Sequence, residues 1–219
     1  MNEGRGEVPR ARLVEVLARA RDLGFLGPGP VDPHIVHAEG FGEIAEAVLG
    51  GPPGEFVDLG TGGGPPGLVL CLRWPDARVL LLDSSRRRAD VLRDAVATLG
   101  LQGRVEVRAE RAEVAGRSTE LRERYALVTA RGFAEPAVTA EIAAGFVRPA
   151  GVLIVSDPPT VARDRWPASS LAALGFGPAE AFALQSGHYT AVRKVSPTPD
   201  TYPRGIGRPG KRPLWTSAG

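Results

Sequence analysis

The segment VDLGTGGGPPG at 57–67 constrains the fold of this chain more than any other stretch. A short apolar run leads into it, and an apolar stretch of helical character follows it. Glycines at such a place let the backbone turn sharply and approach a ligand closely, and the next helix offers its N-terminal N–H groups to that ligand. The segment therefore predicts a strand, a ligand-binding loop and a helix, which open a Rossmann-like domain.

Strand-like and helix-like segments alternate along the chain after this loop. Apolar or alternating runs predict strands at 55–60, 77–84, 103–110, 125–131 and 151–157. The stretches between them predict helices at 66–74, 85–100, 136–147 and 169–175. The segments 179–185 and 189–195 predict a closing antiparallel pair. This order predicts an α/β fold with a seven-stranded, mainly parallel sheet, and the closing pair is typical of class I AdoMet-dependent methyltransferases.

The chain divides into three parts. Two helical stretches at 10–24 and 34–51 predict an N-terminal helical extension over 1–52. In the first stretch, apolar residues recur at helical spacing: Leu13, Val16, Leu17, Ala20 and Leu23. The ligand-binding domain then covers 53–196, and a basic tail rich in proline and glycine covers 197–219. Because the tail has little apolar content, we expect it to be extended or mobile.

The glycine loop can be interpreted in two ways. The dinucleotide fingerprint G-x-G-x-x-G fits Gly62, Gly64 and Gly67. The methyltransferase pattern D-x-G-x-G-x-G fits Asp58, Gly60, Gly62 and Gly64. A pyrophosphate would need helix N–H groups near Pro65 and Pro66, which have none, and the Asp58 carboxylate would repel it. We therefore favour S-adenosyl-L-methionine (AdoMet), whose ammonium group suits Asp58, over a nicotinamide cofactor or a purely structural loop.

A second acidic residue ends the next predicted strand. Asp83 lies 25 positions after Asp58, where a carboxylate can accept both ribose hydroxyls of a nucleoside cofactor. A structural alternative is that Asp83 caps the following helix, although Ser84 or Ser85 can fill that role. The basic cluster 86–88 forms either a solvated helix face or a contact for RNA.

Composition limits the remaining classes. The formal charge of the chain is only +2, so any nucleic-acid footprint must be local. The single cysteine, Cys71, lies in an apolar stretch and is expected to be a buried small side chain. No apolar run approaches the roughly 20 residues of a membrane span. We expect a cytoplasmic monomer without a metal site and without a membrane segment.

Five motifs resemble one family, the small-subunit ribosomal RNA guanine-N7 methyltransferases, also called glucose-inhibited division protein B. They are VDLGTGGGPPGLVL, LLLDSSRRRADVLRDAVATLGL, ERAEV, TARGFAEP and YPRGIGRPGKRPL, and the similarity covers about residues 55–215. The resemblance implies an AdoMet-dependent enzyme that methylates N7 of a guanine in the 530 loop of 16S ribosomal RNA. It implies ribosomal RNA or the small ribosomal subunit as the partner.

The resemblance also implies site residues. RAE occurs twice, at 108–110 and 111–113, and the second copy fits the family spacing better. The expected cofactor-binding residues are Asp58, Gly60, Thr61, Gly62, Gly64, Pro65, Asp83, Ser84, Ala112, Glu113 and Arg131. The expected substrate-binding residues are Arg131, Arg204, Arg208, Lys211 and Arg212.

No catalytic acid or base is assigned. Guanine N7 carries a free lone pair and no proton, so positioning and electrostatics suffice for in-line methyl transfer. From Arg193 to Arg212 the chain has six basic residues against one acid, a local charge of +5 that suits phosphate. We expect removal of residues 198–219 to spare AdoMet affinity and to weaken RNA binding. The alternative is a solvated tail.

Some positions depart from the family pattern. Ser156 and Asp157 replace a Lys-Gly pair after the fifth strand, which puts an anion near the expected RNA surface. The N-terminal Asn-Leu-Thr motif is missing, and HIVHAE matches the family's histidine segment only at His34. SDPP at 156–159 is interpreted as a turn. These departures leave two alternatives: a paralogue that methylates another RNA or a small molecule, and a non-catalytic AdoMet- or RNA-binding protein.

Overall fold

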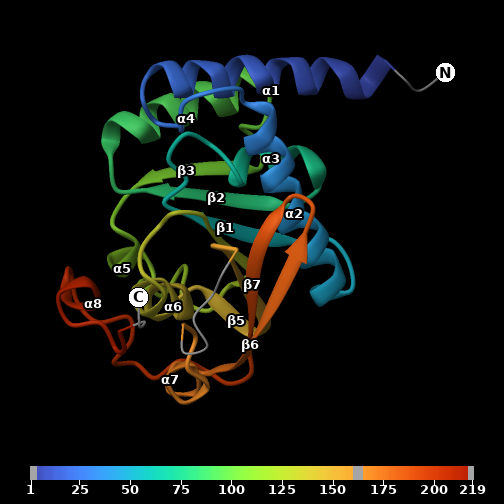
Figure 1. Cartoon of the computed structure of the whole chain (residues 1–219). Helices are drawn as coiled ribbons and strands as arrows, with labels where there is room; N and C mark the ends of the chain where they lie inside the picture. Colours follow the sequence, from blue (N-terminus) through green and yellow to red (C-terminus); the bar gives the residue numbers. More distant parts are fainter. Residues whose placement is uncertain (1–3, 160–164, 217–219) are drawn as a thin grey trace.

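A computed structural model describes residues 4–159 and 165–216, with side chains from residue 10 onward. Seven strands form one sheet in the order β3-β2-β1-β4-β5-β7-β6, and only β7 runs antiparallel to its neighbours (Figure 1). The strands are β1 (Glu55–Leu59), β2 (Arg78–Asp83), β3 (Val105–Ala109), β4 (Tyr125–Ala130), β5 (Val147–Asp157), β6 (Phe176–Leu184) and β7 (Gly187–Lys194). The predicted seven-stranded α/β fold is confirmed.

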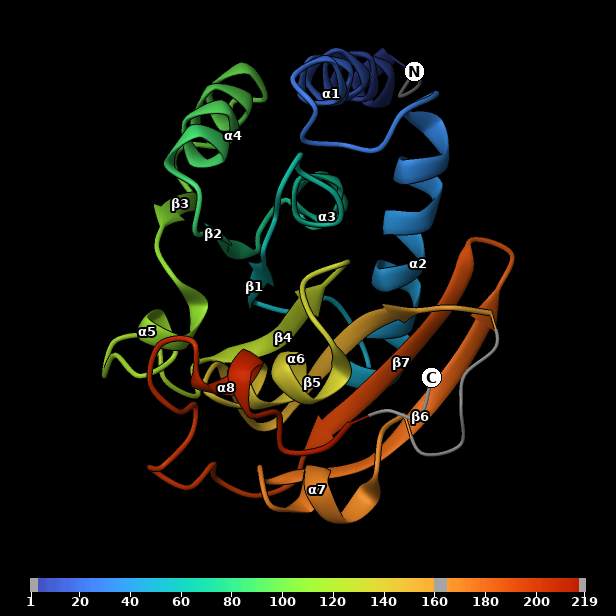
Figure 2. The same ribbon diagram turned by 60° about the vertical axis from the view of Figure 1, so that its left-hand side comes forward.

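Helices cover both faces of the sheet (Figure 2). One face packs against α1 (Gly4–Asp22), α2 (Asp32–Leu49), α3 (Gly67–Arg73) and α4 (Arg86–Thr98). The other face packs against α5 (Ala112–Ala115), α6 (Pro136–Ala144) and α7 (Ala168–Ala172). The parallel strands β1, β2 and β4 are therefore buried on both sides, which explains their continuous apolar sequences. A short helix, α8 (Arg208–Lys211), lies beside α6; α5 and α8 were not expected from the sequence.

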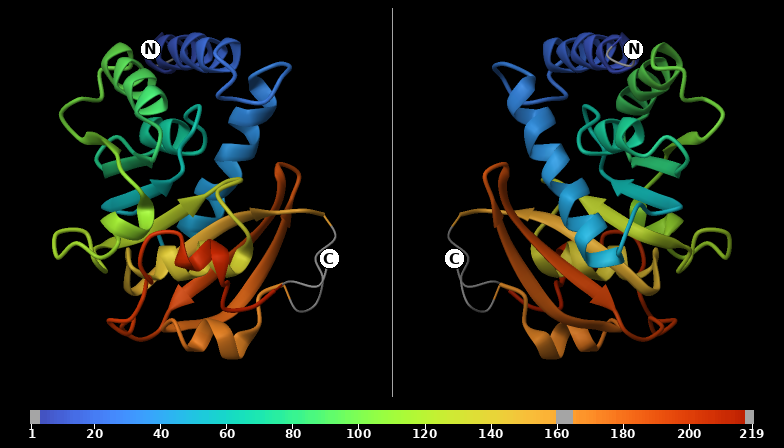
Figure 3. Two further views of the ribbon diagram at one scale, coloured as in Figure 1. Left: turned by 90° about the vertical axis from the view of Figure 1, so that its left-hand side faces the viewer. Right: turned by 90° about the vertical axis from the view of Figure 1, so that its right-hand side faces the viewer.

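The two N-terminal helices contribute to the core of the domain. Leu17 of α1 and Phe41 of α2 are fully buried against the sheet-covering helices. Glu46 of α2 accepts hydrogen bonds from Arg73 Nε at 2.8 Å and from the Trp74 indole at 2.7 Å, both at the end of α3. Figure 3 shows α2 running beside the β6–β7 hairpin, where the Tyr189 hydroxyl donates to the His37 carbonyl at 2.8 Å. The extension is thus anchored at several points.

The described part of the tail, residues 197–216, is folded onto the domain, so our expectation of an extended or mobile segment is wrong. Two arginines of the domain donate to tail carbonyls: Arg117 to Pro203 at 2.7 Å and Arg122 to Tyr202 at 2.8 Å. The buried Lys194 amine contacts Glu123 at 2.8 Å, and the same carboxylate accepts the Thr198 N–H. The local composition of the tail does not reveal these anchors, because they come from distant parts of the chain.

Candidate active site

A cavity of about 290 Å³ opens at the carboxyl ends of the parallel strands, where open α/β sheets bind their ligands. The glycine loop after β1, the end of β2, the start of α5 and the loop after β4 form its walls. Five of the expected cofactor residues line it: Gly60, Asp83, Ser84, Ala112 and Glu113. Both RAE copies reach this cavity: the second contributes Arg111, Ala112 and Glu113, and the first contributes Glu110.

The glycine loop is held against the second strand. Gly60 adopts a φ of +65°, and a Cβ there would lie only 2.6 Å from the ring of Phe133, so no larger residue fits without displacement. The Gly62 N–H donates to Asp83 Oδ2 at 3.0 Å. This bond fixes the loop to the end of β2 and places the Gly60 backbone at the cavity wall.

Asp83 retains capacity to bind a ligand. Its Oδ1 accepts the Ser85 N–H at 2.8 Å, and its Oδ2 accepts the Gly62 N–H and lies 3.6 Å from Arg88 Nη1. Each carboxylate oxygen can accept a further bond, so two hydroxyls of a ribose can still be bound. The Ser85 side chain accepts the Arg88 N–H, which makes Ser85 the N-cap of α4 and leaves Asp83 free of that role.

Glu113 forms the opposite wall and is almost fully buried. Its Oε1 accepts bonds from Arg111 at 2.7 and 2.9 Å and from the Gly207 N–H at 3.1 Å. Burial works to raise the pKa of Glu113, but these hydrogen bonds outweigh it and hold the pKa below its ordinary value. All three side-chain bonds recorded for the described residues fall on Oε1, which leaves Oε2 able to accept from a ligand.

The structure corrects the place of Asp58. Its side chain has no exposed surface and is absent from the cavity lining, so it does not meet the ammonium of a ligand as we expected. Instead it accepts the Gly67 N–H at 3.2 Å and the Thr129 hydroxyl at 2.7 Å, which join β1, α3 and β4. Burial raises the pKa of Asp58 to about 7, and the hydrogen bonds oppose that rise. Asp58 therefore braces the loop from below.

The start of α3 provides no anion site. Pro65 and Pro66 lack N–H groups, and the Gly67 N–H is already bound to Asp58. A Cβ at Gly67 would lie 2.8 Å from the Asp58 carboxylate, so this close contact needs glycine. The geometry excludes the dinucleotide interpretation of the loop, because a pyrophosphate would find no donor there.

Three further loop residues also support the loop from outside the cavity lining. Thr61 is buried, and its hydroxyl donates to the Asp58 carbonyl at 3.0 Å. Gly64 closes the turn by donating to the Thr61 carbonyl at 3.0 Å, and Pro65 is buried. Our expectation that Thr61, Gly64 and Pro65 line the cofactor site is therefore wrong for this cavity. The pattern of the motif predicted the turn but could not distinguish the residues that shape it from those that face its ligand.

Arg131 follows the last residue of β4 and is half-buried at the same edge of the sheet. It does not line the described cavity but contacts His34 of α2, with 3.3 Å between Arg131 Nη1 and His34 Nδ1. The contact joins the N-terminal extension to the carboxyl edge of the sheet. Arg131 was expected to bind cofactor and substrate, but its contact with His34 was not expected from the sequence.

The C-terminal segment supplies part of the cavity wall, which sequence reasoning missed. Gly207, Pro209 and Gly210 line the cavity opposite the end of β2. The adjacent side chains of Arg208, Lys211 and Arg212 are exposed. Phe133, after β4, was also missed, although its place in the motif TARGFAEP next to Arg131 is a signal that could have identified it.

Arg204 differs from the other basic residues of the tail. Its guanidinium forms a two-point ion pair with Glu141 of α6, at 2.8 Å to Oε1 and 2.6 Å to Oε2, and its backbone N–H donates to the same carboxylate. Glu141 is completely buried. The expectation that Arg204 binds substrate is therefore wrong, because its guanidinium is paired with the buried Glu141. This partner lies 63 positions away in the sequence, so the local sequence around Arg204 does not reveal it.

Asp157 at the end of β5 is also paired. Its side chain is 2% exposed and accepts bonds from Arg165 Nε at 2.7 Å and the Trp166 indole at 2.8 Å. The Thr190 hydroxyl donates to it as well. The more exposed member of this pair is the Arg165 guanidinium, so the expected anion at the surface is neutralised by a residue eight positions later.

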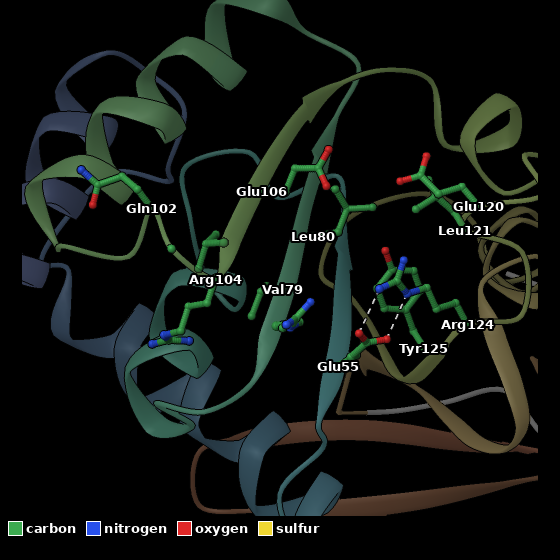
Figure 4. A pocket seen from close by; sticks show the side chains of 13 residues that line it. Glu55, Val79, Leu80, Gln102, Arg104, Glu106, Glu120, Leu121, Arg124 and Tyr125 are labelled. Atoms are coloured by element: carbon green, nitrogen blue, oxygen red, sulfur yellow. Dashed lines mark hydrogen bonds and ion pairs between the residues drawn. The ribbon is translucent and has the colours of Figure 1, made fainter.

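A second cavity, of about 300 Å³, lies at the amino ends of β1 to β4 (Figure 4). Acidic and basic side chains both line this cavity. Glu55 and Arg124 face each other and form a two-point ion pair with both distances at 3.0 Å. Ligands of open α/β sheets bind at the opposite edge, so we assign the functional site to the carboxyl-edge cavity.

The described ranges contain neither a metal-site cluster nor a membrane-spanning helix. Within residues 4–159 and 165–216, no three histidine, cysteine, aspartate or glutamate side chains gather as a metal site would require. None of the helices described has the length and apolar character needed to cross a membrane. Cys71 is buried in α3, as expected, and burial raises the pKa of its thiol to about 12.

The sequence is similar to those of known proteins over most of the chain. Residues 43–156 match the model of the GidB family, described as rRNA small subunit methyltransferase G. A relative of that name from Moorella thermoacetica is 38% identical over 74% of this chain and 70% of its own length. Another from Roseiflexus castenholzii is 37% identical over 75% of this chain and 73% of its own length.

Solved structures support the fold class. An O-methyltransferase from Bacillus cereus, solved in complex with SAH, superimposes with a TM-score of 0.57 at 18% identity, covering 84% of this chain and 91% of that one. This likeness confirms the predicted class I methyltransferase fold. Together with the family match and the relatives, it means that the chain belongs to the rRNA small subunit methyltransferase G family.

Proposed function

We propose that this protein uses AdoMet to methylate N7 of a guanine in the 530 loop of 16S ribosomal RNA. The single observation that carries the proposal is that the C-terminal segment contributes both to the cavity wall and to an exposed basic surface. Gly207 and Pro209 line the cofactor cavity, while Arg208 and Lys211 beside them are exposed cations suited to phosphate. A cofactor cavity and a phosphate-binding surface thus meet on one segment.

The residues of the cavity fit AdoMet. Asp83 has the free acceptor capacity to hold the ribose hydroxyls, and Ala112 and Glu113 lie where the adenine is expected. The narrow loop at Gly60 allows a close approach of the ligand to the backbone. When bound, AdoMet supplies an electrophilic methyl group.

The acceptor chemistry requires only positioning. Guanine N7 attacks with its own lone pair, so no side chain has to remove a proton. The two histidines near the carboxyl edge, His34 and His37, both have a pKa below the ordinary histidine value because of burial and the charge of Arg131. Both histidines are therefore uncharged at neutral pH, and the positive charge beside them is that of Arg131. Arg131, Arg208, Lys211 and Arg212 remain our candidates for RNA contact.

Asp157 was expected to place a negative charge at the RNA surface, which favoured a different substrate, but the structure does not support this expectation. Asp157 is buried and paired with Arg165, so it presents little negative charge to an approaching phosphate. We therefore keep ribosomal RNA as the substrate, and we propose a cytoplasmic monomer, which size-exclusion chromatography can test.

The direct experiment supplies radiolabelled AdoMet with unmethylated small subunits, naked 16S ribosomal RNA and tRNA, and maps the product by mass spectrometry. We expect label on one guanine N7 of 16S ribosomal RNA. Label only in tRNA, or no transfer to any RNA despite AdoMet binding, would refute the proposed substrate.

A matched pair of variants tests the site itself. Asp83→Ala removes the carboxylate of the cavity, whereas Asp76→Ala removes an exposed acid just before β2. We expect Asp83→Ala to raise the Kd for S-adenosylhomocysteine about tenfold or more, the effect of losing hydrogen bonds to a charged group. Asp76→Ala should leave it unchanged. Equal affinities for both variants would contradict the assignment of this cavity.

A further inference from the structure

Arg131 is a half-buried cation without a carboxylate in contact. No described acid forms an ion pair with its guanidinium, and the charge of Asp58 is the one that most favours its charged form. Burial lowers the pKa of Arg131, because the charged form is partly removed from water. Without a carboxylate partner, the Arg131 guanidinium must be oriented by hydrogen bonds to neutral acceptors. The contact that the structure provides comes from His34.

The chemistry of this contact defines the state of the imidazole. Arginine has only donors, so at 3.3 Å from Arg131 Nη1 the His34 Nδ1 atom must offer its lone pair. His34 is then neutral, with its proton on Nε2. The ring also forms a hydrogen bond to the backbone of Gly27 in the connector between α1 and α2. Two elements of the N-terminal extension therefore fix the ring that faces Arg131.

The groups around His34 favour the same state. Burial lowers the pKa of His34 most, the charge of Arg131 lowers it further, and the hydrogen bond to Gly27 only partly opposes them. His37, one turn along α2, has a pKa of about 4 for the same two reasons, and its buried Nδ1 has no hydrogen-bond partner among the described residues. Tyr189 of β7 packs against His37 and is uncharged at neutral pH. No carboxylate contacts the pair, so nothing there stabilises a second cation.

We propose that His34 is a positioning residue that accepts a hydrogen bond from Arg131 and fixes its guanidinium at the carboxyl edge of the sheet, beside the proposed methyl-transfer site. This inference rests on the proposed function, since it assigns Arg131 a task in that site. Through His34, the N-terminal helix α2 becomes a working part of the active site in addition to covering the sheet. Protonation turns Nδ1 into a donor and places a second positive charge beside Arg131, so the contact is lost at acidic pH.

Two substitutions separate the hydrogen bond from the shape of the side chain. His34→Asn retains an acceptor near the position of Nδ1, whereas His34→Phe retains a ring without an acceptor. We expect His34→Phe to lower kcat for RNA methylation about tenfold with a smaller change in KM for AdoMet. His34→Asn should keep most of the activity and lose the decline in rate that the unmodified protein shows as His34 titrates below pH 6.5. His188→Phe changes a histidine that has no contact with Arg131 and serves as the control.

A measurement that needs no RNA tests the same contact. Nitrogen-15 NMR of the imidazoles in the full-length protein should show His34 as the neutral tautomer protonated at Nε2 at pH 7.5. A proton on Nδ1, or a charged ring, would overturn the inference even if methylation fails for other reasons. Wild-type kcat and an unchanged pH profile in His34→Phe would overturn it as well. Absence of RNA methylation by the unmodified protein, with the expected tautomer present, would refute the proposed function alone.

Discussion

The ion pair between Arg204 and Glu141 gives the sharpest prediction, because sequence analysis and structure assign Arg204 opposite roles. The Glu141 carboxylate has no exposed surface, and the Arg204 side chain is 22% exposed. Replacing Arg204 with alanine leaves a buried carboxylate with the backbone N–H of residue 204 as its remaining partner. The variant should be destabilised, whereas a surface arginine used for RNA contact would be neutral for stability.

The expected size of the effect follows from the burial. Removing one partner of a buried ion pair costs about 3–5 kcal/mol, and the partial exposure of Arg204 places the loss near the lower limit, about 3 kcal/mol. For a chain of 219 residues, each kcal/mol lowers Tm by about 2–4 °C, which gives a decrease of roughly 6–12 °C. The loss of the bond from Arg204 Nη2 to the Arg212 carbonyl acts in the same direction.

Urea and thermal unfolding, followed by circular dichroism, measure this loss. Arg208→Ala is the matched control, because that side chain is exposed in the same segment, and it should change the free energy of unfolding by less than about 0.5 kcal/mol. In a Glu141→Gln background no buried charge is left behind, so Arg204→Ala should cost only about 0.5–1.5 kcal/mol there. If Arg204→Ala and Arg208→Ala were equally stable and both lost RNA affinity, Arg204 would be a substrate contact and the structural reasoning would be refuted.

Three further predictions concern the cavity and the extension. Glu113→Ala should raise the Kd for S-adenosylhomocysteine about tenfold or more in calorimetry, because it removes a charged acceptor and frees the Gly207 N–H. Deletion of residues 205–219 should weaken the same binding, since it removes Gly207 and Pro209 from the cavity wall. Glu46→Gln should lower the free energy of unfolding by about 1–2 kcal/mol at pH 7, as expected for lost charge-assisted bonds. That difference should disappear between pH 4.5 and about 2, because Arg73 and Trp74 hold the pKa of Glu46 at about 2 and its contribution is lost on protonation.

Each of these has a matched control. Deletion of 213–219 keeps α8 and should preserve cofactor affinity; equal losses from both deletions would show that the cavity wall is not the cause. Glu43→Gln changes an exposed acid on the same helix as Glu46 and should have no pH-dependent effect on stability. A Glu46→Gln difference that persists at pH 2 would contradict the depressed pKa. For Glu113→Ala the control is Asp76→Ala, and similar affinities would remove Glu113 from the site.

The sequence predicted the sheet because buried parallel strands have a distinct composition. Runs such as VLLL in β2 and VLIV in β5 are apolar at every position, which is what a strand covered on both faces requires. The expected residues that line the cavity are local to strand ends: Asp83 is the last residue of β2, and Gly60, Ser84, Ala112 and Glu113 each follow a strand by a few residues. Since the carboxyl ends of parallel strands meet at one edge, order along the chain was enough to bring these residues together.

The wrong expectations for Asp58 and Arg204 concern partners far away in sequence. Asp58 fits the motif, but its burial depends on Thr129, which is 71 positions away. Arg204 was counted as one charge in a basic tail, and its pairing with Glu141 spans 63 positions. A charge count cannot distinguish an exposed cation from a paired one, because the difference arises only when distant segments pack.

The sequence by itself determined the order of the strands and of the longer helices, the turn at the glycine loop, the edge of the sheet at which the candidate site lies and, through shared motifs, the family. These features depend on local backbone preferences and on the alternation of apolar segments, which a single chain displays directly. Only the tertiary structure decided that the C-terminal segment closes the cofactor cavity, that Arg204 is a buried anchor, and that His34 of the N-terminal extension contacts Arg131. Such contacts depend on how complete helices, strands and loops pack against one another. The hydrogen bonds that stabilise these contacts form only when the packing brings distant residues together.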